Sequence, residues 1–111
     1  MGFFVTSTAA ATAVVGYDCL LNSQVSNSSQ NRVLRGVAFT GSAAAGDAAI
    51  DVYIDSVRIA TIYNSKLLTP NTDDIQPVDD LIVPAGAIIH AYVIDAPATN
   101  PVFVGLSLSQ I

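Results

Sequence analysis

The single histidine, His90, is the side chain of this sequence best suited to acid–base chemistry near neutral pH. A catalytic role would require a nucleophile and an orienting acid close to it, and no sequence motif supplies them. His90 lies between Ile89 and Ala91, in a run whose pattern predicts a β-strand. We therefore expect a strand residue that is hydrogen-bonded locally or faces an interface, and we predict that the chain is not an enzyme.

Two pairs of aspartates, Asp73-Asp74 and Asp79-Asp80, could bind a hard cation through their carboxylate oxygens. Their spacing differs from that of an EF-hand loop, in which the ligands alternate and surround a glycine. A solvated acidic loop is the simpler interpretation. A calcium site shared between subunits is the alternative, and no other cofactor is predicted.

The chain has one cysteine, Cys19, so an intramolecular disulfide is excluded. No basic side chain lies near Cys19 in the sequence, and a small buried hydrophobe is therefore expected rather than a reactive thiol. One cysteine and one histidine cannot form a standard zinc motif.

The composition predicts one domain with few surface charges. The 111 residues include nine aspartates, no glutamate and four basic residues, which gives a net charge of −5 and disfavours a nucleic-acid-binding role. Charged residues make up only 12% of the chain and hydrophobic residues 51%. Either the exterior consists of Ser, Thr, Asn and Ala, or copies of the chain or other proteins cover much of it. No stretch reaches the ~18 uninterrupted apolar residues of a membrane span.

Alternating apolar residues predict an all-β fold, and the scarcity of Glu, Lys and Arg argues against surface helices. The clearest hairpin is Ala48–Tyr63, with a turn at Asp55-Ser56 and a buried face formed by Ile50, Val52 and Ile54. Strands are predicted at Phe3–Ser7 (an edge strand or a flexible arm), Ala13–Leu21, Arg32–Thr40, Ala48–Asp55, Val57–Tyr63, Val78–Val83, Ile88–Ile94 and Val102–Leu108. This spacing predicts a single antiparallel β-sandwich, jelly-roll-like, with about seven or eight strands. It forms one domain over residues 1–111, with an N-terminal arm and the first strands within residues 1–31.

Several predicted strands are apolar on both faces, which favours contacts with other subunits. Three aromatic residues lie opposite the best-patterned core faces and are the candidate interface residues: Tyr53, Tyr92 and Phe103. We expect a homo-oligomer, or binding to a partner, through a largely apolar contact.

Two segments carry a resemblance to known proteins: RGVAFTGSAAAGDAAIDVYIDSVRIATIYN and VPAGAIIHAYVIDAPATNPVFVGLSLS, which lie between Arg32 and Ser109. The chain resembles small jelly-roll proteins encoded by tailless icosahedral double-stranded DNA viruses, such as bacteriophages. The resemblance implies a structural protein of the virion: a minor capsid, penton, spike-base or decoration protein whose partners are its own copies and the major capsid protein. The alternative is a carbohydrate- or surface-binding module that uses exposed tyrosines and the acidic loop, assisted by calcium.

Overall fold

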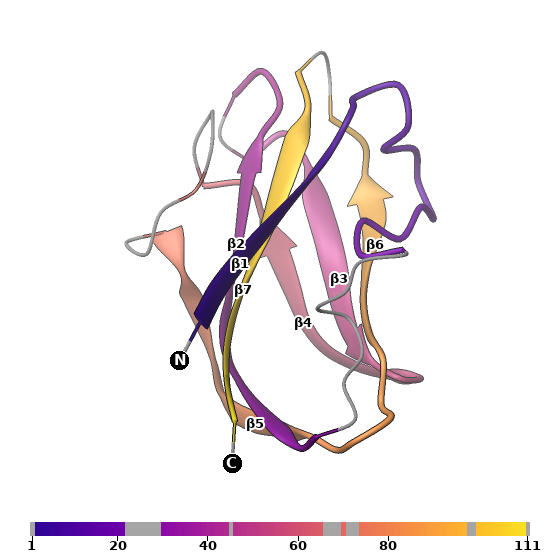
Figure 1. The fold of residues 1–111 in the computed structure, drawn as a ribbon. Helices are drawn as coiled ribbons and strands as arrows, with labels where there is room; N and C mark the ends of the chain where they lie inside the picture. The colour runs from indigo at the N-terminus through magenta and orange to yellow at the C-terminus, as the bar shows by residue number, and fades with distance from the viewer. Residues whose placement is uncertain are drawn as a thin grey trace.

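Residues with alternating apolar side chains form two antiparallel sheets that face each other (Figure 1). The computed structural model describes residues 2–21, 30–44, 46–65, 70, 74–97 and 100–110. Sheet A contains, in spatial order, β1 (Gly2–Thr8), β7 (Val102–Gln110), β2 (Arg32–Gly41) and β5 (Gln76–Val83). Sheet B contains, in spatial order, β4 (Val57–Tyr63), β3 (Ala49–Ile54) and β6 (Ile89–Asp95). The predicted all-β sandwich is confirmed.

The Ala13–Leu21 segment, which follows β1, lies along the free edge of β6 (Figure 1). Asp18 and Tyr92 form an isolated antiparallel bridge, and the Gly16 N–H donates to the Val93 carbonyl at 2.7 Å. The segment thus occupies the place of an eighth strand in sheet B. With it included, the chain alternates between the two sheets at most connections, as in a jelly roll.

The sequence predicted a regular strand over Ala13–Leu21, and this prediction is wrong. The structure has only an isolated bridge there, at Asp18. Gly16 has a positive φ of 93°, which turns the chain before the bridge. The carboxylate of Asp18 accepts a hydrogen bond from the Leu20 N–H at 2.9 Å, and this contact turns the chain after it.

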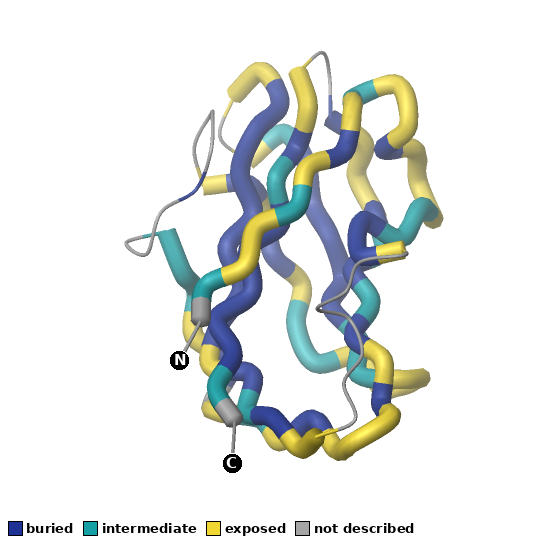
Figure 2. Tube along the Cα trace, viewed as in Figure 1, coloured by how far each residue is buried: buried dark blue, intermediate teal, exposed yellow. Residues whose placement is uncertain are grey.

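The turn and the buried face predicted for the Ala48–Tyr63 hairpin are confirmed, and a bulge between Val52 and Tyr53 shifts the pairing of β3 with β4. Ile50 and Val52 have no exposed surface, and Ile54 is half-buried where β3 reaches the turn at Asp55-Ser56. Facing them, β7 contributes Val102, Val104, Leu106 and Leu108, all buried. Figure 2 shows this buried core along β2, β3 and β7, with exposed residues concentrated in the turns.

The first strand, β1, pairs with β7 along its whole length, from Gly2 opposite Leu108 to Thr8 opposite Val102. The edge-strand interpretation of this segment is therefore correct. The polar run 22–29, which belongs to the predicted arm region, lies outside the described residues.

The Cα radius of gyration is 12.7 Å, the size of a compact domain of about 100 residues. Within the part of the chain that the structure describes, no helix has the length and apolar character needed to cross a membrane.

Candidate functional site

Two of the candidate interface residues, Tyr53 and Tyr92, meet on the outer face of sheet B. Ile50 and Val52 point into the core, so the alternation of β3 directs Tyr53 outward. The rings of Tyr53 and Tyr92 pack edge to face, with centroids 5.4 Å apart and planes inclined by 77°. Both side chains are half-buried, and each keeps part of its surface open to solvent.

A hollow of about 530 Å³ opens beside this tyrosine pair. Its volume lies within the range of roughly 300–1,000 Å³ that is usual for small-ligand sites. The lining combines aromatic, acidic and aliphatic side chains, chiefly Tyr53, Tyr92, Asp51, Asp55, Val15 and Ile94. We call this surface the tyrosine hollow.

The two aspartates of the hollow are held by different contacts. Asp51 is buried, although it lies on the outer face; one carboxylate oxygen accepts a hydrogen bond from the Thr61 hydroxyl, and the other lies 3.8 Å from the guanidinium of Arg58. Asp55 lies in the hairpin turn with a φ of 54°, in the left-handed region that aspartate tolerates.

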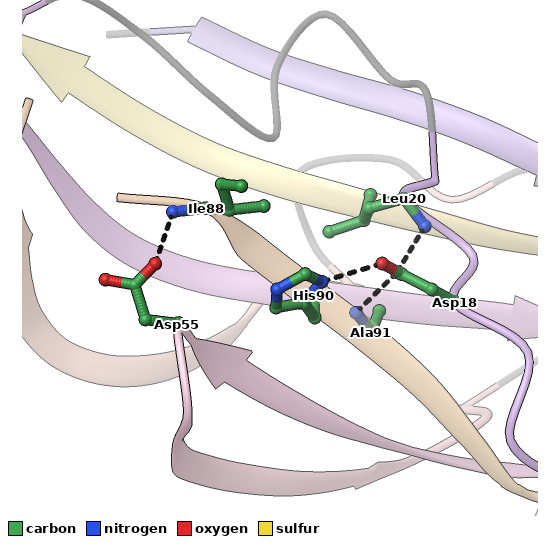
Figure 3. Close-up of polar contacts among 6 residues, drawn as sticks. All are labelled: Asp18, Leu20, Asp55, Ile88, His90 and Ala91. Carbon is green, nitrogen blue, oxygen red and sulfur yellow. Dashed lines mark hydrogen bonds and ion pairs between the residues drawn. The ribbon is translucent and has the colours of Figure 1, made fainter. Parts of the chain in front are cut away.

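Asp55 exchanges two hydrogen bonds with Ile88, which lies just before β6; Figure 3 shows the one that its carboxylate accepts. Its N–H donates to the Ile88 carbonyl at 2.8 Å, and its Oδ1 accepts from the Ile88 N–H at 3.0 Å. The hairpin turn is thereby fixed against the start of β6. The second carboxylate oxygen of Asp55 has no hydrogen bond within the described chain.

His90 lies beside the hollow and forms a hydrogen-bonded pair with Asp18, its Nδ1 lying 2.8 Å from Asp18 Oδ2 (Figure 3). Asp18 Oδ1 also accepts hydrogen bonds from the N–H groups of Leu20, at 2.9 Å, and Ala91, at 3.0 Å. The imidazole stacks on Tyr92, with centroids 5.2 Å apart and planes within 18°. His90 thus supports Tyr92 and ties the Ala13–Leu21 segment to sheet B.

The hydrogen-bond partner of His90 is 72 residues away in the chain, so this bond is not local in sequence. The alternative, that His90 faces an interface, stays a prediction. An aspartate on Nδ1 is the arrangement that orients the base in catalytic triads. A triad also needs a nucleophile on the other ring nitrogen. Among the described residues no hydroxyl or thiol is hydrogen-bonded to Nε2 of His90. The contact between His90 and Asp18 therefore has a structural role here, which is to hold the Ala13–Leu21 segment against sheet B.

Phe103 does not join the two tyrosines. It is half-buried on β7 of sheet A, where it lies opposite Ser7 of β1 and Thr40 of β2. Val102 and Val104 on either side point into the core, so Phe103 points outward from the other sheet. The three candidate interface residues are therefore divided between opposite faces of the sandwich.

The acidic residues proposed as calcium ligands are only partly within the described chain. Asp73 and the side chain of Asp79 lie outside it, and Asp74 is half-buried in a short turn. Asp80 has a φ of 50° and places its carboxylate 3.2 Å from the guanidinium of Arg35. No group of three or more potential metal ligands is found among the described residues, and the calcium site stays a prediction.

Cys19 is buried, with 6% of its surface exposed. Burial is the main cause that raises the pKa of its thiol to about 11, and the neighbouring charge of Asp18 acts in the same direction; a hydrogen bond with Thr8 opposes them. A thiol that holds its proton at neutral pH is a poor nucleophile. Its position agrees with the buried hydrophobe expected from the sequence.

The sequence contained a usable signal for part of this site. Alternation alone places Asp51, Tyr53 and Asp55 on one outer face of the hairpin. The contributions of Asp18 and Val15 come from a turn-rich segment, and no periodic pattern predicts which strand that segment will contact.

Fold and site together define a small jelly-roll sandwich with an aromatic and acidic hollow on one face. No protein-family model matches this chain, and neither the curated proteins nor the solved structures that were compared with it gave a match.

Proposed function

We propose that this protein is a non-enzymatic structural subunit of a virion, which self-associates and packs into a protein shell. The observation that carries the proposal is the part of the outer face of sheet A formed by β1 and β7, which is uncharged and partly apolar. Neither β1 nor β7, which lie side by side there, contains a charged residue. A sheet face of this kind on a soluble protein usually marks a contact with another protein.

The centre of this face consists of small residues beneath an aromatic ring. Gly105 of β7 lies between Val5 of β1 and Ala38 of β2, and the pairing places all three on the outer side. The ring of Phe3 lies directly over Gly105, because a Cβ built on that glycine would be 2.6 Å from Phe3 Cε1. We call this surface the Gly105 face, defined by Phe3, Val5, Ala38, Phe103 and Gly105. A second sheet that approaches this face would meet Phe3, Val5 and Phe103, because Phe3 covers Gly105 and Ala38 has no exposed surface.

The distribution of charge favours a second copy as the occupant of the Gly105 face. The chain carries a net charge of −5, so random contacts between copies are repulsive. Sheet B presents Asp51 and Asp55 near its outer face, and pairing that face with itself would bring carboxylates together. Pairing through the Gly105 face avoids this, because β1 and β7 carry no charge. A symmetric contact of this kind is the commonest way in which identical subunits associate.

The virion role is supported by the jelly-roll topology and by the resemblance of residues 32–109 to viral shell proteins. The proposed partners are further copies of the chain and the major capsid protein. The proposal covers four kinds of virion subunit: minor capsid, penton, spike-base and decoration proteins. In each, assembly would cover the outer face of the sandwich. Fold alone does not imply function, so the proposal depends on the Gly105 face.

The oligomeric state tests the proposal. Light scattering at micromolar concentration should give a mass above that of the monomer, in low and in high salt, because an apolar contact is little screened by ions. Val5→Asp places a charge on the Gly105 face at a residue that is already 39% exposed, and it should yield a folded monomer. Electron microscopy of the protein mixed with a candidate major capsid protein should show added mass on the shell.

Val57→Asp is the matched control. Val57 is 63% exposed at the end of β4, on sheet B, and the same change there should leave the oligomer intact. A wild-type monomer in every condition, with no binding to the shell, would refute the assembly proposal. Equal loss of the oligomer in both variants would place the contact elsewhere.

A further inference from the structure

The tyrosine hollow offers more hydrogen-bonding capacity than the chain itself uses. The hydroxyls of Tyr53, Tyr92 and Ser56 make no hydrogen bond within the described residues, and one oxygen of Asp55 is also unpaired there. Hydroxyls both donate and accept, and a carboxylate accepts. These groups surround an aromatic and aliphatic surface formed by the tyrosine rings, Val15 and Ile94.

The geometry of the hollow is fixed before any ligand arrives. Tyr92 is backed by the stacked imidazole of His90, and Asp18 holds that imidazole at 2.8 Å. The turn that carries Asp55 is fixed by its two hydrogen bonds with Ile88. A site whose side chains are already ordered loses less conformational entropy on binding.

The lining chemistry restricts the class of ligand. Two carboxylates, Asp51 and Asp55, disfavour an anion. A wholly apolar molecule would leave the tyrosine hydroxyls and the Asp55 oxygen without partners when it displaced water from them. The ligand therefore needs an apolar face for the rings and several hydroxyls at its rim. A neutral pyranose has both, because its axial C–H groups form an apolar patch and its equatorial hydroxyls point outward.

We propose that the tyrosine hollow is a binding site for a neutral carbohydrate. The sugar ring packs on Tyr92 and Ile94. Its hydroxyls donate to the free oxygen of Asp55 and exchange hydrogen bonds with the Tyr53 hydroxyl. The site lies on sheet B, opposite the Gly105 face, so it remains open when the subunit assembles through sheet A.

The test is a titration of ¹⁵N-labelled protein, followed by amide NMR shifts, with methyl glycosides of glucose, galactose, mannose and N-acetylglucosamine. At least one glycoside should produce saturable shifts confined to residues around the hollow. Tyr92→Ala should weaken that binding roughly tenfold or more, the loss typical of a central aromatic contact. Tyr63→Ala is the matched control, since Tyr63 is a 54% exposed tyrosine on β4 outside the hollow.

Asp55→Asn is a second variant that tests the proposal if Tyr92→Ala does not fold. Asparagine tolerates the positive φ and keeps an oxygen for the Ile88 N–H, yet it removes the negative charge that accepts the sugar hydroxyl. This variant should fold and bind the glycoside several-fold more weakly. Choline chloride and sialyllactose serve as cationic and acidic probes. Binding of choline without any glycoside, shifts that Tyr92→Ala leaves unchanged in a folded protein, or no shift with the whole panel would each overturn the proposal.

Discussion

Asp18 and His90 are joined through Oδ2 and Nδ1 at 2.8 Å, although 72 residues separate them in the chain. The same carboxylate accepts hydrogen bonds from the N–H groups of Leu20 and Ala91. Its side chain is 11% exposed and that of His90 is 22% exposed, so water competes poorly for these contacts. One aspartate thereby reinforces the bridge between Asp18 and Tyr92, where the Ala13–Leu21 segment meets sheet B.

We expect Asp18→Ala to destabilise the protein by about 1–3 kcal/mol, the cost of leaving largely buried donors without a partner. The two N–H groups and the imidazole all lose their acceptor in this variant. Urea denaturation should show a lower midpoint with an unchanged slope. Asp95→Ala is the control, because Asp95 is exposed at the end of β6. Similar midpoints for the two variants would mean that the Asp18 contacts contribute little to stability.

The buried thiol of Cys19 predicts a loss of stability at alkaline pH. Burial raises its pKa from the ordinary value of 9.0 to about 11. Below pH 9 the thiol holds its proton in both the folded and the unfolded chain. Between pH 9 and pH 11 the unfolded chain releases the proton and the folded chain keeps it, so the free energy of unfolding falls as the pH rises.

Comparison with Cys19→Ala isolates this effect from other titrating groups. The difference in unfolding free energy between the wild type and the variant should shrink from pH 9 to pH 11 and stay constant below pH 9. Denaturant titrations at a series of pH values measure it. A difference that does not change with pH would contradict the raised pKa. Iodoacetamide should also modify the native thiol far more slowly than the unfolded one at pH 8.

Gly41 and Gly86 provide a matched pair for testing a close backbone contact. Both have a positive φ, 111° and 83°, so alanine is strained at either position. A Cβ on Gly41 would lie 2.3 Å from the Pro101 carbonyl oxygen, whereas a Cβ on Gly86 would meet no atom within 4 Å. Gly86→Ala should lower the unfolding free energy by about 1 kcal/mol. Gly41→Ala should lower it by several kcal/mol or prevent soluble expression, because the backbone of the 100–102 region must move. Equal melting temperatures for the two variants would show that the Pro101 contact is absent.

The alternation of apolar residues was sufficient to predict most of the fold. It located β2, the β3–β4 hairpin with its turn, and β7, and it identified Ile50 and Val52 as core residues. This worked because a strand directs successive side chains to opposite faces, so the sequence itself records which face is buried. The same reasoning failed over Ala13–Leu21, where Gly16 and the Asp18 turn interrupt the strand.

The sequence by itself determined the class of fold, the scarcity of surface charge and the outward direction of Tyr53, Tyr92 and Phe103. Only the tertiary structure decided that Phe103 belongs to a different face from the two tyrosines, because strand order depends on connections between sheets and leaves no local periodicity. The pairing of Asp18 with His90 likewise required the chain to fold back over 72 residues. Contacts between segments far apart in the chain depend on how the two sheets pack on each other. That packing places Tyr53 and Tyr92 on the outer face of sheet B and Phe103 on the outer face of sheet A.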